Sequence, residues 1–216
     1  MMTTFNRIIP LVFCLVGFQS AANYTLPDYQ EFTLDNGLTV MLMEQNEVPL
    51  IDVNIVIKAG AIADNEKAGL AQITADNLVF GTSSKTKSEV NDEVDFIGAN
   101  LNSSANLEFS KVTASFAKKD QDQILSLLQA MVLDPRFETK DFENQKKRHL
   151  LKLEQAKESP KSVINNYFAR FTFGEGGYGA AKNGNATSVA AISLDDVKSF
   201  HQSYYQPKNS AIVVVG

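Results

Sequence analysis

The chain has 216 residues, enough for one large domain or two small ones with a sizeable hydrophobic core. Hydrophobic residues make up 44% and charged residues 21% of the sequence, which is ordinary for a globular protein. The formal net charge of −5 argues against nucleic acid or an anionic membrane surface as the main partner.

Residues 1–22 have the pattern of a cleaved secretory signal peptide, with one basic residue, Arg7, before the apolar run 8–18 and small residues at the end. The apolar run is too short to span a bilayer, so we expect no stable membrane anchor. The only cysteine, Cys14, lies in this run, and the mature chain 23–216 therefore has no disulfide and no thiolate ligand. These features predict a periplasmic or secreted protein.

The first third of the mature chain predicts a hairpin, a strand and a buried helix. Alternating hydrophobic residues flank Asp35-Asn36-Gly37, a strong hairpin signal. A run rich in β-branched residues then indicates an interior strand, and apolar residues at helical spacing indicate a helix closed by Gly81. The predicted elements are strands 31–34, 38–43 and 50–57, followed by a helix that starts near Leu70 and ends near Phe80.

The rest of the chain predicts two further strands, five helices and a last strand. Ser88, Asp120 and Ser193 are the expected N-caps of three helices, and Gly98 is the expected end of the first. The elements are helix 88–97, strands 99–106 and 108–117, helices 121–133, 140–158, 160–171 and 194–204, a glycine-rich loop 174–184, and a buried strand 211–215. With no linker composition, this order predicts one mature domain, 23–216, of the α+β class.

Eight short stretches follow one another along the mature chain: Leu34 to Val40, Pro49 to Asn54, Gly69 to Ala71, Leu78 to Thr82, Gly98 to Asn102, Asp134 to Phe137, Gly177 to Gly179 and Tyr205 to Gly216. Together they resemble the N-terminal half-domain of the M16 zinc peptidases, the insulinase, pitrilysin and processing peptidase group. Each stretch alone is a weak signal, but their order and spacing along the chain are specific, and they cover nearly the whole mature chain. The resemblance implies a mixed, mostly antiparallel sheet with helices on one face.

The zinc-binding motif of that family is replaced in this chain. Active members carry His-x-x-Glu-His on the helix, where two imidazoles bind Zn²⁺ and the glutamate activates its water. The corresponding positions are Gln72, Ala75 and Asp76. The third ligand, a glutamate roughly 75 residues further on, corresponds to Lys152 or the residue after it. The resemblance thus implies zinc in the family and missing ligands here, so we expect no cofactor and no catalysis by the chain alone.

Other catalytic or metal-binding arrangements have little support in the sequence. The two histidines, His149 and His201, lie on different predicted helices, where we expect them to be solvated. Gln72, Asp76 and Glu154 form the one candidate for a weak oxygen-ligated site. An active metallopeptidase with such an unconventional metal site is therefore an alternative hypothesis. No Ser-His-Asp arrangement and no phosphate-binding loop can be placed.

The strand after Gly98 is a candidate peptide-binding edge. In M16 enzymes the equivalent strand pairs with substrate, and backbone pairing needs no metal and no particular side chain. Asn102, Ser103 and Ser104 would then flank the bound peptide. The alternative is an edge strand that its polar residues keep soluble.

The resemblance implies a non-catalytic M16 peptidase-like protein, a peptide-binding or scaffolding subunit of a zinc-dependent periplasmic peptidase. Its expected partners are a catalytic M16 subunit or second half-domain, and a peptide or unfolded polypeptide. In the family a second copy of this unit follows in the same chain, and here the sequence stops after the first. A truncated fragment without independent function is therefore a further alternative.

Overall fold

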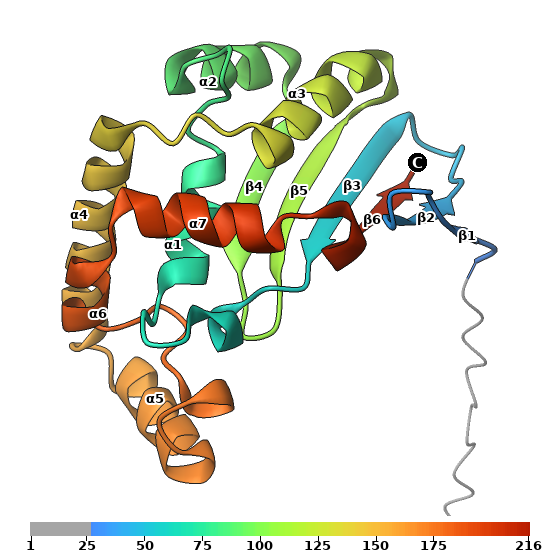
Figure 1. The fold of residues 1–216 in the computed structure, drawn as a ribbon. Coiled ribbons are helices and arrows are strands. Elements are labelled where there is room, and N and C mark those ends of the chain that lie inside the picture. Colours follow the sequence, from blue (N-terminus) through green and yellow to red (C-terminus); the bar gives the residue numbers. More distant parts are fainter. Residues whose placement is uncertain (1–26) are drawn as a thin grey trace, which may run out of the picture.

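The computed structural model describes residues 27–216, and the predicted signal peptide lies outside these residues. Six strands form one sheet in the order β1-β2-β6-β3-β5-β4, with helices on one face (Figure 1). Neighbouring strands are antiparallel except for β2 and β6, which are parallel. The predicted fold, α+β with a mixed and mostly antiparallel sheet, is confirmed. The strands are β1 Gln30–Thr33, β2 Thr39–Met43, β3 Leu50–Ile57, β4 Asn100–Ala105, β5 Ser110–Ala117 and β6 Ser210–Val215.

The helices cover the half of the sheet formed by β4, β5 and β3 (Figure 1). Alternate residues of β5 are buried beneath them, and Ile73 of α1 and Ile124 of α3 pack fully buried in the same core. Burial of each such side chain contributes about 1.5–3 kcal/mol. The helices are α1 Leu70–Leu78, α2 Lys87–Ile97, α3 Gln121–Leu133, α4 Thr139–Ala156, α5 Pro160–Phe173, α6 Ala186–Ala191 and α7 Leu194–Tyr204, with short 3-10 turns at Ala61–Asp64, Lys118–Asp120, Gly177–Gly179 and Pro207–Asn209.

A buried carboxylate, that of Asp64, caps the N-terminus of α1. Asp64 Oδ2 accepts the Gly69 N–H and Oδ1 accepts the Ala71 N–H, both over 2.7 Å. Gly69 itself has φ +99°, a conformation that favours glycine. Asp64 is buried, and this burial raises the pKa of its carboxyl to about 6 although the backbone hydrogen bonds oppose the shift. These two hydrogen bonds satisfy backbone N–H groups at the start of the helix and so fix where α1 begins.

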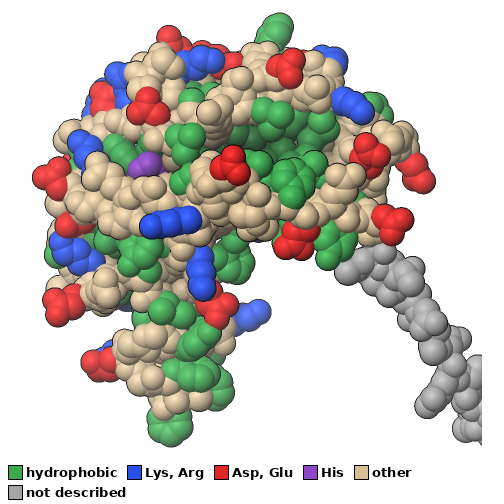
Figure 2. Space-filling view, turned by 45° about the vertical axis from the view of Figure 1, so that its right-hand side comes forward, with side chains coloured by type: hydrophobic (Ala, Val, Ile, Leu, Met, Phe, Trp, Pro, Cys, Tyr) green, Lys and Arg blue, Asp and Glu red, His purple; other side chains and the backbone are tan. Residues whose placement is uncertain are grey.

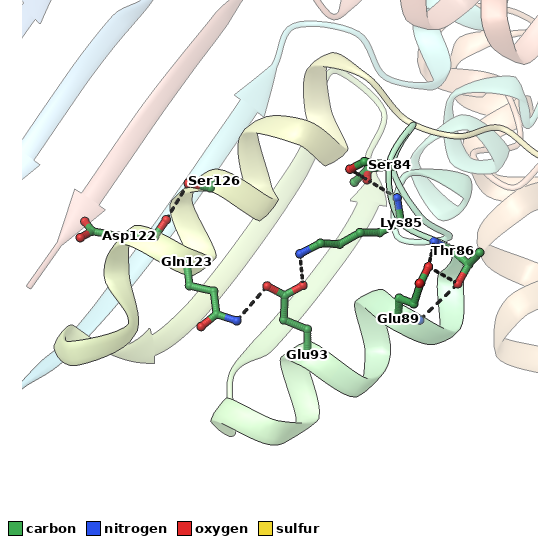
Figure 3. A network of polar contacts seen from close by, with 9 residues as sticks. Ser84, Lys85, Thr86, Glu89, Glu93, Asp122, Gln123 and Ser126 are labelled. Carbon is green, nitrogen blue, oxygen red and sulfur yellow. Dashed lines mark hydrogen bonds and ion pairs between the residues drawn. The ribbon is translucent and has the colours of Figure 1, made fainter.

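A polar network attaches the peripheral helix α2 to α3 (Figure 3). Glu93 of α2 pairs with the Lys85 ammonium and accepts a hydrogen bond from Gln123 Nε2 of α3 over 2.8 Å. The N-cap of α2 is Thr86, whose backbone N–H donates to the Glu89 carboxylate in a capping box. The predicted cap at Ser88 is therefore wrong by two residues, because Thr86 has the glutamate three positions later that a capping box requires.

Three other details differ from the sequence-based expectations. Helix α6 was not predicted; Asn185 caps it, and it has only six residues. The apolar residues of helix 140–158 predict an inward face that includes Leu151, but Leu151 is exposed. Strand β6 is half-buried instead of buried, because helices cover only one of its neighbours.

The uncovered half of the sheet leaves an apolar groove between α3 and β6. We call it the β6 groove; its cavity has a volume of about 280 Å³. Leu125 and Leu133 of α3 form one wall and are 40% and 55% exposed. Leu38, Ile55 and Ile212 line the sheet side. Figure 2 shows hydrophobic side chains gathered in a hollow of this face, and others on the protruding end of the molecule that contains α5. In the part of the chain that the structure describes, no helix is long and apolar enough to cross a membrane.

Candidate functional site

The positions that correspond to the zinc motif lie on the side of α1 that faces β4 and α4. Gln72 Oε1 accepts the backbone N–H of Ala105, the last residue of β4, over 3.2 Å. Gln72 Nε2 donates to Asp76 Oδ1 over 2.7 Å, one helical turn further along. Gln72 therefore links the edge of the sheet to the carboxylate on α1.

Helix α4 supplies the other half of this network. Gln145 Nε2 donates to Asp76 Oδ2 over 2.8 Å. Arg148 in turn donates to Gln145 Oε1 through Nε over 3.1 Å and Nη2 over 2.8 Å. Its guanidinium lies 5.8 Å from the centroid of the Phe80 ring. The Asp76 carboxylate thus accepts one amide N–H at each oxygen. The positively charged guanidinium of Arg148 contacts one of these amides, that of Gln145.

His149 lies beside this network and is buried, so the expectation that it is solvated is wrong. Its Nε2 donates to the carbonyl oxygen of Asn183 over 2.8 Å, which leaves Nδ1 directed to Asp76 Oδ2 at 4.0 Å. His201 is buried as well: its Nε2 donates to the Val132 carbonyl oxygen over 2.8 Å, and burial lowers its pKa. Buried histidines of this kind are held by backbone acceptors.

The residues present do not fit a zinc ion. Ala75 is fully buried and has no polar atom, while Gln72 offers a neutral amide, a poor zinc ligand. Both oxygens of Asp76 already accept amide hydrogens. Within residues 27–216 no group of three or more His, Cys, Asp or Glu side chains is arranged to hold a metal.

The α4 positions singled out from the sequence lie away from Asp76. Lys152 is exposed, and Glu154 is exposed and pairs with Lys157 over 2.8 Å. The structure therefore brings Gln72 and Asp76 together but does not add Glu154 to them. The α4 residues that reach the site are Gln145 and His149, which the sequence reasoning missed. Their spacing after the buried Phe142, three and seven residues, places all three on one helical face and was the available signal.

The predicted peptide-binding strand is indeed an edge of the sheet. β4 pairs only with β5 and is the last strand in the order. Ser103 faces the helices, is buried, and its Oγ has no hydrogen-bond partner within the described residues. Asn102 and Ser104 point to the opposite, open face, so the three predicted residues do not share one side of the strand.

Comparison with known proteins identifies relatives that are longer than this chain. Subunit 1 of the mitochondrial cytochrome b-c1 complex of Bos taurus is 25% identical over 193 residues, which cover 89% of this chain and 40% of that protein. The zinc protease PqqE of Helicobacter pylori is 26% identical over 207 residues, covering 93% and 46%. The chain spans less than half the length of these relatives.

Solved structures share the fold. An inactive M16 peptidase domain from Pseudomonas fluorescens has a TM-score of 0.84 at 24% identity, covering 88% of this chain and 46% of that chain. The periplasmic protease PqqL of Escherichia coli has a TM-score of 0.79 at 17% identity, covering 89% and 22%. The sequence profile of the insulinase family matches residues 39–181. Because this match covers most of the sequence, the chain belongs to the insulinase family, peptidase family M16.

Proposed function

We propose that this chain is a non-catalytic M16 half-domain that binds an extended peptide or unfolded polypeptide along the edge of β4. It would serve a catalytic M16 subunit or second half-domain in the periplasm. One observation carries this proposal. The residues at the zinc-motif positions, Gln72 and Asp76, form a hydrogen-bonded network, while the neighbouring edge strand β4 has outward backbone groups without a hydrogen-bond partner among the described residues.

The network supports the non-catalytic part of the proposal. Asp76 is engaged at both oxygens and the position of the water-activating glutamate is occupied by Ala75. The two amide hydrogen bonds hold the Asp76 carboxylate in place, and no carboxylate stands at the water-activating position. Neither a metal-bound water nor a general base can therefore be assigned to this helix.

The edge strand supports the binding part. The outward backbone N–H and C=O groups of Leu101 and Ser103 make no hydrogen bond within residues 27–216. An extended peptide can pair with such groups and gain most of its affinity from main-chain hydrogen bonds. The open edge is short, and it carries the polar side chains Asn100, Asn102 and Ser104, which disfavour the pairing of one sheet edge with another.

The partner is inferred from relatives and from an uncovered surface. The relatives described above are about twice as long or longer, so each contains at least one further unit of comparable size. The β6 groove offers a partner half-domain an apolar surface that the described residues leave exposed. The periplasmic location rests on the predicted signal peptide and on the likeness to a periplasmic protease.

The test is peptide binding with a backbone-specific variant. Ser103→Pro removes the outward N–H of β4 without removing a hydrogen bond to β5, and proline is tolerated on edge strands. Ser103→Ala is the matched control because it changes the side chain and keeps the N–H. We expect a dye-labelled decapeptide of alternating threonine and alanine to bind the wild type and Ser103→Ala, to bind Ser103→Pro at least tenfold more weakly, and to remain uncleaved.

Two results would contradict the proposal. Equal binding by Ser103→Pro, with an unchanged circular dichroism spectrum, would show that the edge of β4 is not the binding site. Metal-dependent cleavage that is lost in Asp76→Ala would favour the alternative, an active metallopeptidase with an unconventional metal site.

A further inference from the structure

We propose that Gln72 is a positioning residue that ends the peptide-binding edge of β4 at Ala105. The inference rests on the proposed function, because it concerns how a bound peptide pairs with this strand. Gln72 stands where active members of the family carry a zinc ligand, and here its side chain accepts the Ala105 N–H. A residue at a former metal position would thereby set the length and register of peptide pairing.

The pairing of β4 with β5 determines which backbone groups face outward. Asn106 donates its N–H to the Phe109 carbonyl at the turn, so this pair is hydrogen-bonded. In an antiparallel ladder hydrogen-bonded pairs alternate with pairs that are not. Ala105, Ser103 and Leu101 belong to the second kind and direct both N–H and C=O away from β5. The hydrogen bond from Ala105 to Gln72 agrees with this assignment.

Both ends of the outward edge are already occupied. Beyond Ala105, the carbonyl oxygen of Asn106 accepts the Ala61 N–H over 2.9 Å. At the other end the Ala99 N–H donates to the Val94 carbonyl at the end of α2 over 3.0 Å. With Ala105 taken by Gln72, the donors left on this edge are the N–H groups of Leu101 and Ser103.

The Gln72 side chain is held in this position by its other contacts. Its Nε2 donates to Asp76, which is itself fixed by Gln145 and, behind it, Arg148. A side chain held in place loses little conformational freedom when it accepts a hydrogen bond, so it competes well with an incoming peptide. A bound peptide should therefore pair with two donors and stop before Ala105.

The experiment is amide hydrogen exchange by NMR on the full chain, with and without the decapeptide described above. In the free wild type we expect the Ala105 amide to be protected and those of Leu101 and Ser103 to exchange rapidly. The peptide should protect Leu101 and Ser103 and leave Ala105 unchanged. In Gln72→Ala the Ala105 amide should exchange rapidly in the free protein and become protected by the peptide, which should bind about three- to tenfold more tightly because it gains one hydrogen bond.

Asp76→Asn is the matched control, since its Oδ1 can still accept from Gln72 and the carboxylate charge is lost. It should show the wild-type exchange pattern. If the peptide binds the wild type and Gln72→Ala with equal affinity and protects the same amides, the role of Gln72 is overturned while peptide binding at β4 stands. If Ala105 exchanges rapidly in the free wild type, the inference fails whether or not Gln72→Ala folds. If the peptide protects neither Leu101 nor Ser103 in any of the three proteins, the proposed function itself fails, and the inference with it.

Discussion

Gln145 of α4 donates a hydrogen bond to Asp76 of α1 over 2.8 Å, although 69 residues separate them in the sequence. The contact joins α4 to α1, the helix that packs against β4, and the carboxylate between the two amides is the centre of the network. In a family whose active members place a metal ion between these helices, the replaced residues supply a hydrogen-bonded connection between the same two elements.

Asp76→Ala should lower the free energy of unfolding by about 1–3 kcal/mol, because it leaves the amides of Gln72 and Gln145 without their acceptor in a partly buried place. Urea denaturation followed by circular dichroism measures the change. Asp76→Asn keeps one acceptor oxygen and should cost less than the alanine variant. Equal stability of wild type and Asp76→Ala would show that the network contributes nothing to holding α1 and α4 together.

Much of the fold was predictable because its signals are local. The turn Asp35-Asn36-Gly37 and the β-branched run of β3 were enough to place those strands, and the bounds of β3 agree with the prediction to the residue. Helix α6 was missed because six residues show too little periodicity to stand out from a loop. The inward position predicted for Leu151 is wrong because leucines and lysines alternate closely along α4, so the sequence of this helix does not fix which of its leucines face the core.

The candidate site was only partly predictable. The replaced positions Gln72 and Asp76 are evident from a short motif, whereas Gln145 and His149 reach them through the packing of α4 against α1. Counting along the sequence from family spacing led to Lys152, which is exposed. A spacing along the sequence does not fix how α4 is rotated against α1, and three-dimensional packing shows that Gln145 and His149 face Asp76.

Restoring two imidazoles should create a zinc site together with His149. In Gln72→His/Asp76→His, the new side chains lie one turn apart on α1, and His149 directs Nδ1 to the same place. We expect the double variant to retain about one zinc per chain after dialysis and the wild type to retain far less. Elemental analysis of the purified proteins measures this. Adding His149→Ala should abolish retention; if it does not, His149 is not the third ligand.

The β6 groove should take part in association with a catalytic M16 subunit. Leu133→Lys adds a charge to the groove at a side chain that is 55% exposed, so it should change the free energy of unfolding by only about 0.5 kcal/mol. We expect it to reduce co-elution with a co-expressed M16 subunit that has an intact His-x-x-Glu-His motif. Phe96→Lys is the matched control, since Phe96 is an exposed hydrophobic residue on α2 and does not line the groove. Unchanged co-elution of Leu133→Lys would place the interface elsewhere.

Asp64 should make stability depend on pH. Burial raises its pKa from 3.8 to about 6 in the folded chain, so the folded state binds the proton more tightly than the unfolded state does. The stability that this proton contributes is fully present below the unfolded pKa of 3.8 and is lost as the pH rises through about 6. A shift of this size corresponds to about 3 kcal/mol.

Asp64→Asn isolates this contribution because asparagine does not titrate. The difference in unfolding free energy, wild type minus Asp64→Asn, should fall by about 3 kcal/mol from about pH 3.5 to about pH 7. Urea denaturation at a series of pH values measures both proteins under identical conditions, so the titration of all other groups cancels. A difference that rises with pH would mean that the hydrogen bonds from Gly69 and Ala71 and the dipole of α1 favour the carboxylate more than burial disfavours it. In that case Asp64 acts at neutral pH as a charged cap that stabilises α1.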